Sequence, residues 1–199
     1  MKIGIDLDEC LTEYVFGFLN YYNNTHKTNF HFWEIKNYKL WELIGGTKEE
    51  AINTVYAFHE TNYFKELPVV FGAKNAVEEL RKFSELLIIT SRPNELINKT
   101  NQWLDQHFHN KFSNILFTNE WSKSGERKQK SEICKNLKLD FLIEDNLDYA
   151  LNCSGYVRRV FLLDKPWNQT ENGNLPRDVD RVYNWNEILE KIEMVKNGK

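Results

Sequence analysis

Two acidic residues, Asp6 and Asp8, directly follow a short apolar run near the start of the chain, in the stretch KIGIDLDE. Two carboxylates about 4 Å apart repel each other by roughly 4 kcal/mol at an effective dielectric constant near 20. Such a pair therefore needs a bound cation or a proton. Mg²⁺ suits a cluster of oxygen ligands, and a carboxylate in that setting can also attack a phosphorus atom. The pair indicates phosphoryl-transfer chemistry.

Further polar side chains follow two other apolar runs of strand length. Thr90 and Ser91 come after LLII, Glu144 and Asp145 lie at the end of FLIED, and Lys130 stands in the polar stretch GERKQKSE. Ligands of an open parallel sheet bind outside the carboxyl ends of its strands, so we expect these residues to meet at one edge. Carboxylates there could hold a hard cation, while hydroxyl and ammonium groups could hold phosphate oxygens.

The strands that must carry these side chains are predicted at residues 2–6, 86–90, 114–118, 141–144 and 160–163. Segments with the apolar spacing of helices separate the later strands, and a last amphipathic helix is expected at 187–199. This alternation predicts an α/β fold with a Rossmann-like, doubly wound parallel sheet. The stretch 16–71 is too long for a simple crossover and is rich in aromatic residues. We expect a core of residues 1–15 and 72–199, with an all-helical cap inserted at 16–71.

Each motif has an ordinary structural explanation when it is taken alone. An isolated DxD more often marks a solvated turn, and Thr90-Ser91 would more often cap a helix. Lys130 alone would be surface charge. Their order and their common place at strand ends favour one phosphotransfer site.

The lysine of that site has competitors, namely Lys123, Lys128 and Lys135. We prefer Lys130 because it begins the helical run SEICKNL, from which its ammonium could reach a phosphate above the neighbouring strand ends.

The overall charge limits the classes of partner. The formal net charge is −3 at pH 7, which does not favour duplex nucleic acid or an anionic membrane as a partner. No signal peptide is evident, and no stretch approaches the roughly 18 apolar residues of a membrane span, so we expect a cytoplasmic protein. The three cysteines, Cys10, Cys134 and Cys153, are odd in number and widely spaced, and we interpret them as reduced thiols.

Taken together, the motifs resemble those of the haloacid dehalogenase-like (HAD) phosphohydrolases. The family's four motifs correspond in order to Asp6-Leu7-Asp8, Thr90, Lys130 and Glu144-Asp145. Within that superfamily the chain resembles the bacterial 5'(3')-deoxyribonucleotidases, in which Glu commonly follows the DxD and an all-helical cap lies between the first two motifs. The stretches YFKELPVVFGAKNAVEELRK and LLDKPWN are also similar. The chain departs from the wider superfamily at Glu9, where Gly is usual, and at Glu144, where Asp is usual.

The resemblance implies a Mg²⁺-dependent phosphatase of nucleoside monophosphates. Asp6 would be the nucleophile that becomes an aspartyl-phosphate, and Asp8 would protonate the leaving group and then activate water. The metal ligands would be Asp6, Asp8, through its backbone carbonyl, and Asp145. The phosphate would be held by Thr90, Ser91 and Lys130.

Aromatic residues of the insertion have two interpretations. Phe30, Phe32, Trp33, Tyr38 and Trp41 would pack the core of the cap, or some would face a cleft where a base could stack. By resemblance, Tyr14 stands where an aromatic residue lines the base pocket.

Two histidines could suggest a second metal site. His107 and His109 follow a predicted helix, however, and we interpret them as its polar end.

Three functions remain open from the sequence. The first is the nucleotide phosphatase, the second is a phosphatase of a sugar phosphate or a nucleic-acid end, and the third is a non-catalytic HAD-like domain that binds a partner. The sequence leaves open the base, the sugar, the 5' or 3' position of the phosphate and the oligomeric state.

Overall fold

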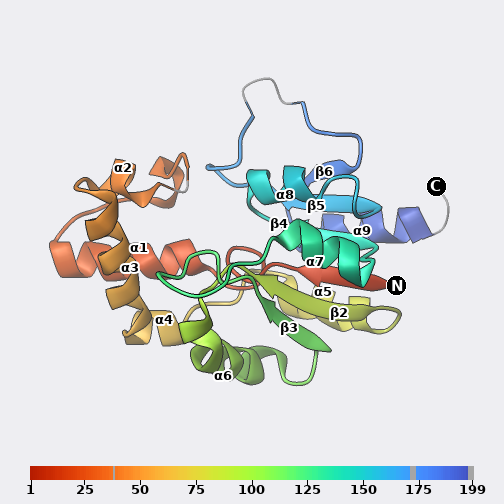
Figure 1. The fold of residues 1–199 in the computed structure, drawn as a ribbon, viewed down its shortest axis with the longest axis horizontal. Coiled ribbons are helices and arrows are strands. Elements are labelled where there is room, and N and C mark those ends of the chain that lie inside the picture. Colours follow the sequence, from red (N-terminus) through yellow and green to blue (C-terminus); the bar gives the residue numbers. More distant parts are fainter. Residues whose placement is uncertain (38, 171–173, 197–199) are drawn as a thin grey trace.

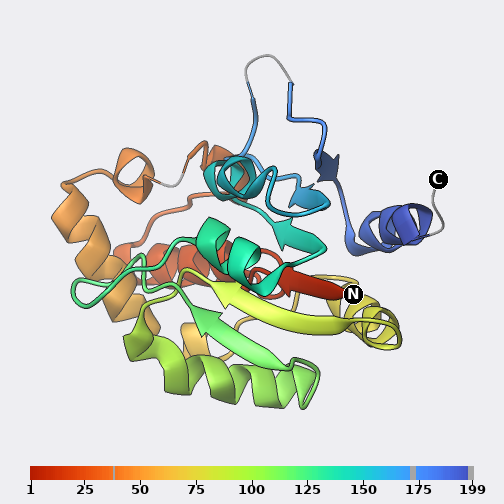
Figure 2. The same cartoon turned by 45° about the vertical axis from the view of Figure 1, so that its right-hand side comes forward.

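The centre of the computed structural model, which describes residues 1–37, 39–170 and 174–196, is a six-stranded parallel β-sheet (Figures 1 and 2). Its strands are β1 (Lys2–Ile5), β2 (Glu85–Thr90), β3 (Asn114–Phe117), β4 (Phe141–Glu144), β5 (Arg159–Leu163) and β6 (Val179–Val182). They are ordered β3-β2-β1-β4-β5-β6, and every neighbouring pair is parallel. The winding reverses between β1 and β4, which is where a doubly wound sheet forms its ligand crevice. The expected α/β class is confirmed.

Successive side chains of each strand enter two different hydrophobic cores, as strand geometry requires. Ile3 and Ile5 face the core formed with α5 (Ala73–Arg81), α6 (Ile97–Phe108) and α9 (Trp185–Lys196). The opposite face packs against α7 (Lys130–Leu137) and α8 (Leu147–Cys153). A Cβ added at Gly4 would meet Leu139 Cδ1 at 2.7 Å and Ile89 Cδ1 at 2.8 Å, so these side chains would have to shift to admit a larger residue there.

The sixth strand was not predicted. Its sequence, VDRV, places Val179 and Val182 in the core, while Asp180 and Arg181 are half-buried at the sheet edge. A four-residue edge strand with two charged residues gives no apolar run of the kind that identified the other strands. The last helix begins at Trp185, two residues before its expected start, and residues 197–199 of the expected helix lie outside the described part of the chain.

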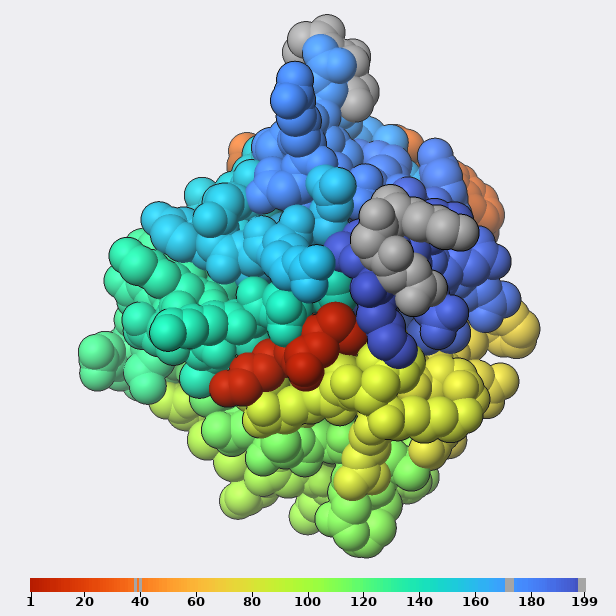
Figure 3. Space-filling model, turned by 90° about the vertical axis from the view of Figure 1, so that its right-hand side faces the viewer, coloured from red at the N-terminus to blue at the C-terminus, as the bar shows by residue number. Residues whose placement is uncertain are grey.

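In the described part of the chain, five helical segments lie between β1 and α5, and they are placed beyond the carboxyl ends of the strands (Figure 1). They are α1 (Tyr14–His26), the 3-10 helix η1 (Phe32–Glu34), α2 (Leu40–Ile44), α3 (Lys48–His59) and α4 (Asn62–Lys65). Thr47 caps α3: its hydroxyl accepts the N–H of Glu50, whose carboxylate accepts the N–H of Thr47. We call these segments the cap; the first of them begins at Tyr14, two residues before the stretch 16–71 where the insertion was expected. In Figure 3, which views the molecule from its other end, the amino end of β1 reaches the surface and the cap is almost hidden.

The chain enters and leaves the cap through two segments that lie side by side. Val70 N–H donates to the Leu11 carbonyl at 2.9 Å, and Glu13 N–H donates to the Pro68 carbonyl at 2.9 Å. Thr12 and Val69 form an antiparallel bridge between these bonds. We call this paired segment the stem of the cap. None of the described helices is long and apolar enough to cross a membrane.

Candidate active site

Asp6 and Asp145 come together at the crevice between β1 and β4. Asp6 directly follows β1, and its backbone N–H donates to the Ile143 carbonyl at 2.9 Å. One potential ligand atom each from Asp6, Asp145 and Cys10 lies within 4.8 Å of the others, the one such acid-containing cluster found in the described residues. The carboxylate of Asp8 is not part of this cluster. His107 and His109 lie outside it as well, at the end of α6, where His109 contacts Asp105.

Lys130 is buried against this cluster at the start of α7. Its Nζ lies 2.5 Å from Asp6 Oδ1 and 2.7 Å from Glu144 Oε2. The other oxygen of Glu144 accepts the backbone N–H groups of Asp145 and Asn146 at 3.2 and 3.1 Å. Burial lowers the pKa of Lys130, but the carboxylates of Asp6 and Glu144 outweigh burial and raise that pKa well above its usual value. The structure therefore places an ammonium ion beside Asp6.

The three competing lysines lie elsewhere. Lys128 and Lys135 are exposed, and Lys123 is exposed with its Nζ donating to Asn53 Oδ1 at 2.8 Å. Of the four candidates, the structure brings Lys130 to the acids.

The charges around Asp6 do not balance when all the acidic residues beside it are ionised. Burial, with the nearby Asp145 and Asp8 carboxylates, raises the pKa of Asp6 from 3.8 to about 7, although Lys130 opposes the shift. The four acidic residues of this region, Asp6, Asp8, Glu144 and Asp145, face two cationic ones, Lys130 and Arg92. A divalent ion would balance this excess of negative charge.

The donor atoms of the cluster fit Mg²⁺. Burial, followed by the Asp145 and Asp6 carboxylates, raises the pKa of the Cys10 thiol well above its usual value. Cys10 therefore stays protonated in the absence of a metal ion, and its sulfur is a soft donor that suits zinc or copper better than Mg²⁺. The carboxylate oxygens that remain are the hard donors that Mg²⁺ prefers and that zinc sites seldom use alone.

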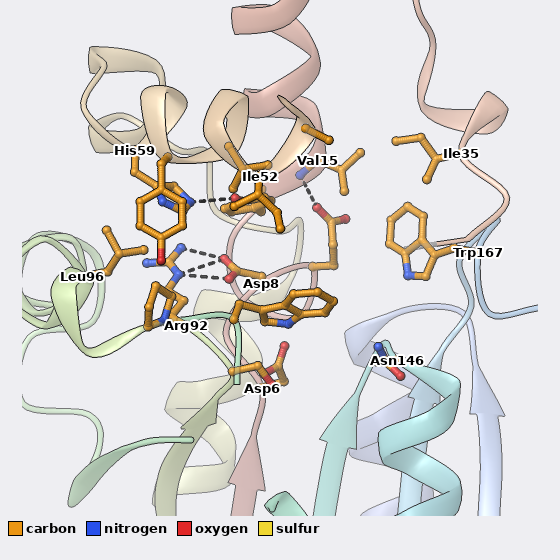
Figure 4. A pocket seen from close by; sticks show the side chains of 18 of the residues that line it. Asp6, Asp8, Val15, Ile35, Ile52, His59, Arg92, Leu96, Asn146 and Trp167 are labelled. Carbon is orange, nitrogen blue, oxygen red and sulfur yellow. Dashed lines mark hydrogen bonds and ion pairs between the residues drawn. The ribbon is translucent and has the colours of Figure 1, made fainter. Parts of the chain in front are cut away.

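Asp8 points away from this cluster and toward Arg92 (Figure 4). Arg92 Nη2 donates to Asp8 Oδ1 at 2.6 Å, and its Nε lies 3.2 and 3.0 Å from the two carboxylate oxygens. Thr12 Oγ1 also donates to Asp8 Oδ1, at 3.0 Å. Arg92 directly follows Thr90-Ser91 in the sequence, and it was not predicted as a site residue.

Thr90 and Ser91 are both buried at the end of β2. Thr90 Oγ1 accepts the backbone N–H of Arg92 at 3.2 Å, which shapes the turn after the strand. Ser91 lines the cavity described below. The structure therefore brings the predicted phosphate-binding residues to the same strand ends as Asp6.

Glu9 and Lys165 form a second buried ion pair beside the site, with 3.2 Å between Glu9 Oε2 and Lys165 Nζ. Glu9 has a φ of 63°, the left-handed region that suits the glycine usual in the superfamily. Its contacts offset that strain, because Glu9 Oε1 also accepts the N–H of Val15 in the first turn of α1 at 2.6 Å. Lys165 was missed as a site residue, although it comes two residues after the strand predicted at 160–163. In the same stretch, Trp167 Nε1 donates to Asp145 Oδ2 at 2.9 Å.

A cavity of about 210 Å³ lies between the cap and the strand ends. Its floor holds Asp6, Asp8 and Ser91, and its walls are mostly apolar and aromatic. The aromatic lining residues are Tyr14, Trp41, Tyr56, Trp121, Tyr149 and Trp167. Of these, the sequence analysis singled out Tyr14 and Trp41; the others come from α3 and from segments that follow strands.

The remaining aromatic residues of the insertion have different surroundings. Phe30 and Phe32 are half-buried against the core, and Phe32 packs edge-on against Trp167 with 5.2 Å between ring centroids. Trp33 is 62% exposed. Tyr38 lies outside the described residues.

Tyr14 contacts a buried histidine of the cap. Its hydroxyl lies 2.8 Å from His59 Nε2. Burial, followed by the Arg92 charge, lowers the pKa of His59 from 6.5 to about 4, so the ring is neutral at pH 7. Burial also raises the pKa of Tyr14, so its hydroxyl stays protonated.

Comparison with known proteins gives consistent matches along nearly the whole chain. A family model described as "5' nucleotidase, deoxy (Pyrimidine), cytosolic type C protein" matches residues 1–197. A 5'(3')-deoxyribonucleotidase of Bacillus subtilis is 25% identical, covering 96% of this chain and 97% of the relative.

Solved structures share the fold at low sequence identity. A haloacid dehalogenase-like family hydrolase from Streptococcus pneumoniae matches with a TM-score of 0.66 and 15% identity, covering 96% of this chain and 97% of the other. The HAD-hydrolase YfnB of Bacillus subtilis, solved bound to magnesium, matches with a TM-score of 0.62 and 13% identity over 96% and 97% of the two chains.

Proposed function

Because the chain belongs to the family of 5' nucleotidase, deoxy (pyrimidine), cytosolic type C proteins, and is thus a phosphoric monoester hydrolase, we propose that it hydrolyses nucleoside monophosphates with Mg²⁺, favouring deoxyribonucleotides. The observation that carries the chemistry is the buried contact of Asp6 with Lys130, 2.5 Å apart, beside Asp145 at the crevice of the sheet. This contact brings the carboxylate proposed as the nucleophile next to a fixed ammonium that can bind phosphate oxygens.

Mg²⁺ would be held by the carboxylates of Asp6 and Asp145 and by the backbone carbonyl of Asp8. When bound, it supplies positive charge that neutralises phosphate oxygens. Lys130 adds a second fixed cation, and Glu144 holds the Lys130 ammonium in place through the 2.7 Å contact. Thr90 and Ser91, at the end of β2, offer hydroxyl groups to the remaining phosphate oxygens.

The proposed reaction has two steps, the formation of an aspartyl-phosphate on Asp6 and its hydrolysis. In the first, an Asp6 oxygen bonds to phosphorus while the bond from phosphorus to the leaving oxygen breaks, and that oxygen takes a proton from the Asp8 carboxyl group. In the second, water attacks the aspartyl-phosphate, and the Asp8 carboxylate takes the proton that the water loses. Asp6 is released as a carboxylate together with inorganic phosphate.

The cavity supports a nucleoside as the leaving group. With the phosphate at Asp6, the rest of the substrate must occupy the space under the cap, whose walls are mostly apolar and aromatic. Such walls suit an uncharged, flat group, since a base stacks on aromatic faces with about 1–3 kcal/mol per contact. A cap over the strand ends also disfavours the end of a nucleic-acid polymer. The three cysteines are buried, and our interpretation of them as reduced thiols is in keeping with a cytoplasmic location.

A panel of substrates tests the proposal. Deoxyribo- and ribonucleoside 5'- and 3'-monophosphates, a sugar phosphate and p-nitrophenyl phosphate would be assayed with Mg²⁺ and with EDTA. We expect deoxyribonucleotides to be hydrolysed fastest, EDTA to stop the reaction and Asp6→Asn to abolish turnover. Asp180→Asn is the control: Asp180 lies on the edge strand β6 and belongs neither to the cavity lining nor to the acidic cluster, so this variant should keep wild-type rates. A folded enzyme that hydrolyses none of these compounds would refute the proposed function, and full activity of Asp6→Asn would refute the nucleophile.

A further inference from the structure

We propose that Arg92 is the positioning residue of Asp8: its guanidinium holds the Asp8 carboxylate away from Asp6 and Asp145 and ties it to the cap. The inference rests on the proposed function, because it assumes that Asp8 transfers the proton of the leaving group. Arg92 would not contact the phosphate in this arrangement.

The orientation of the Asp8 carboxylate depends mainly on Arg92. Among the described residues, four hydrogen bonds reach that carboxylate: three come from Arg92 and one from the hydroxyl of Thr12. A planar guanidinium that engages both carboxylate oxygens fixes their plane as well as their position. The Asp8 side chain remains 27% exposed and lines the cavity, so it is fixed but still within reach of a substrate.

Arg92 is itself held on several sides. Its side chain is 3% exposed, its Nη1 donates to Thr100 Oγ1 on α6 at 3.0 Å, and its backbone N–H donates to Thr90 Oγ1. The guanidinium also lies over the ring of Phe64, on α4 of the cap, with 4.8 Å to the ring centroid. Leaving this position would break all of these contacts, so the geometry favours a fixed support over a side chain that moves to bind phosphate.

Arg92 would keep the Asp8 carboxylate available for proton transfer while Asp6 and Asp145 hold the metal ion. Asp6 and Asp8 are two residues apart at one strand end, and a cation bound at Asp6 and Asp145 would attract the Asp8 carboxylate as a further ligand. A carboxylate that turned to bind the metal ion would no longer face the leaving oxygen. Arg92 offers a competing partner on the side of the cavity, where the leaving group must lie. Because Phe64 belongs to the cap, the position of the carboxylate is linked to the element that covers the substrate.

Two substrates with different leaving groups can distinguish a role of Arg92 in positioning Asp8 from a role in binding phosphate. An alkoxide leaving from a nucleotide needs a proton, whereas p-nitrophenolate leaves without one. We therefore expect Arg92→Met to lower kcat/KM for a deoxyribonucleotide by about 100-fold, near the low end of the usual contribution of general acid catalysis. The same variant should lower kcat/KM for p-nitrophenyl phosphate by less than about threefold. This ratio reports only the steps up to departure of the leaving group, so the second step, in which Asp8 acts as the base with both substrates, does not enter it.

Two comparisons make the test specific. Asp8→Asn should show the same selective loss, and adding Arg92→Met to Asp8→Asn should cause almost no further loss, because the two residues act as one unit. Arg92→Lys keeps the positive charge but loses the planar guanidinium that engages both carboxylate oxygens. Its kcat/KM for the nucleotide should fall between those of the wild type and Arg92→Met. Arg158→Met, at the opposite end of the sheet, should keep wild-type rates.

The contrary outcomes are distinct. The inference would be overturned if Arg92→Met lowered kcat/KM equally for both substrates, or if its effect multiplied with that of Asp8→Asn in the double variant. Arg92 would then be a phosphate ligand or a purely structural residue. Should Arg92→Met fail to fold, Thr100→Val provides the second reading: we expect a smaller loss confined to the nucleotide, and an equal loss on both substrates would overturn the inference. A wild-type enzyme inactive on both substrates would instead refute the proposed function itself.

Discussion

His59 should make the stability of the folded chain depend on pH in a measurable way. The ring is 5% exposed, and burial beside Arg92 lowers its pKa from 6.5 to about 4. Between these two values, the unfolded chain binds a proton at this ring that the folded chain does not bind. The free energy of unfolding therefore falls as the pH falls through this range, and the effect vanishes at pH 7, where neither state holds the proton.

The size of the effect follows from the two pKa values. One unit of pKa corresponds to 1.36 kcal/mol, so this single group should lower the free energy of unfolding by about 2 kcal/mol at pH 5 and by about 3 kcal/mol at pH 4. His59→Gln removes the titrating ring while keeping a polar side chain that can reach the hydroxyl of Tyr14. The variant should be less stable than the wild type at pH 7, but its stability should fall less between pH 7 and pH 4.

Urea unfolding at a series of pH values, in EDTA so that metal binding does not contribute, measures both curves. The informative quantity is the difference between the two proteins, because other buried groups such as Glu9 titrate in both of them. His31→Gln, a change at an exposed histidine, is the control and should follow the wild type. Parallel curves for the wild type and His59→Gln from pH 7 to pH 4 would refute the buried, neutral state of this ring.

Three further predictions concern the metal, the cavity and the core. Activity lost in EDTA should return with Mg²⁺ but not with Ca²⁺, whose looser coordination misaligns the attacking carboxylate; equal rates with both ions in a metal titration would contradict this. Tyr14→Leu should lower kcat/KM for a nucleotide roughly five- to a hundredfold but leave p-nitrophenyl phosphate almost unaffected, whereas unchanged nucleotide kinetics would make Tyr14 a packing residue only. Gly4→Ala should lower the free energy of unfolding by about 1–3 kcal/mol, because the new Cβ would lie 2.7 Å from Leu139 Cδ1; an unchanged urea midpoint would show that the neighbours can move aside.

The elements that could be predicted from the sequence are those whose signal is local. Five strands are continuous apolar runs because both faces of a parallel sheet are covered, and each was found to within a residue or two at its ends. The convergence of Asp6, Lys130 and Asp145 followed from one topological rule, that parallel strands place their carboxyl ends at the same edge.

The parts that escaped prediction depend on contacts distant in sequence. The ion pair of Glu9 with Lys165 joins residues 156 positions apart, and neither residue identifies its partner. The orientation of Asp8 is set by Arg92, whose own position depends on Thr100 of α6 and Phe64 of the cap. The DxD alone indicates a carboxylate pair that needs a cation or a proton, and the sequence carries no sign of which way each carboxylate turns.

The stem of the cap has a consequence for how this protein can change during evolution. Leu11 and Val70 lie side by side. The whole segment between them is therefore attached to the sheet as one long loop whose two ends are adjacent. The entropy of closing a flexible loop grows only slowly with its length, by about 0.6 kcal/mol for each doubling. Insertions or deletions between these anchors, away from the cap residues that pack against the core, would therefore cost the sheet little loop-closure entropy, so descendants of one ancestor could acquire new substrates while inheriting the same catalytic residues.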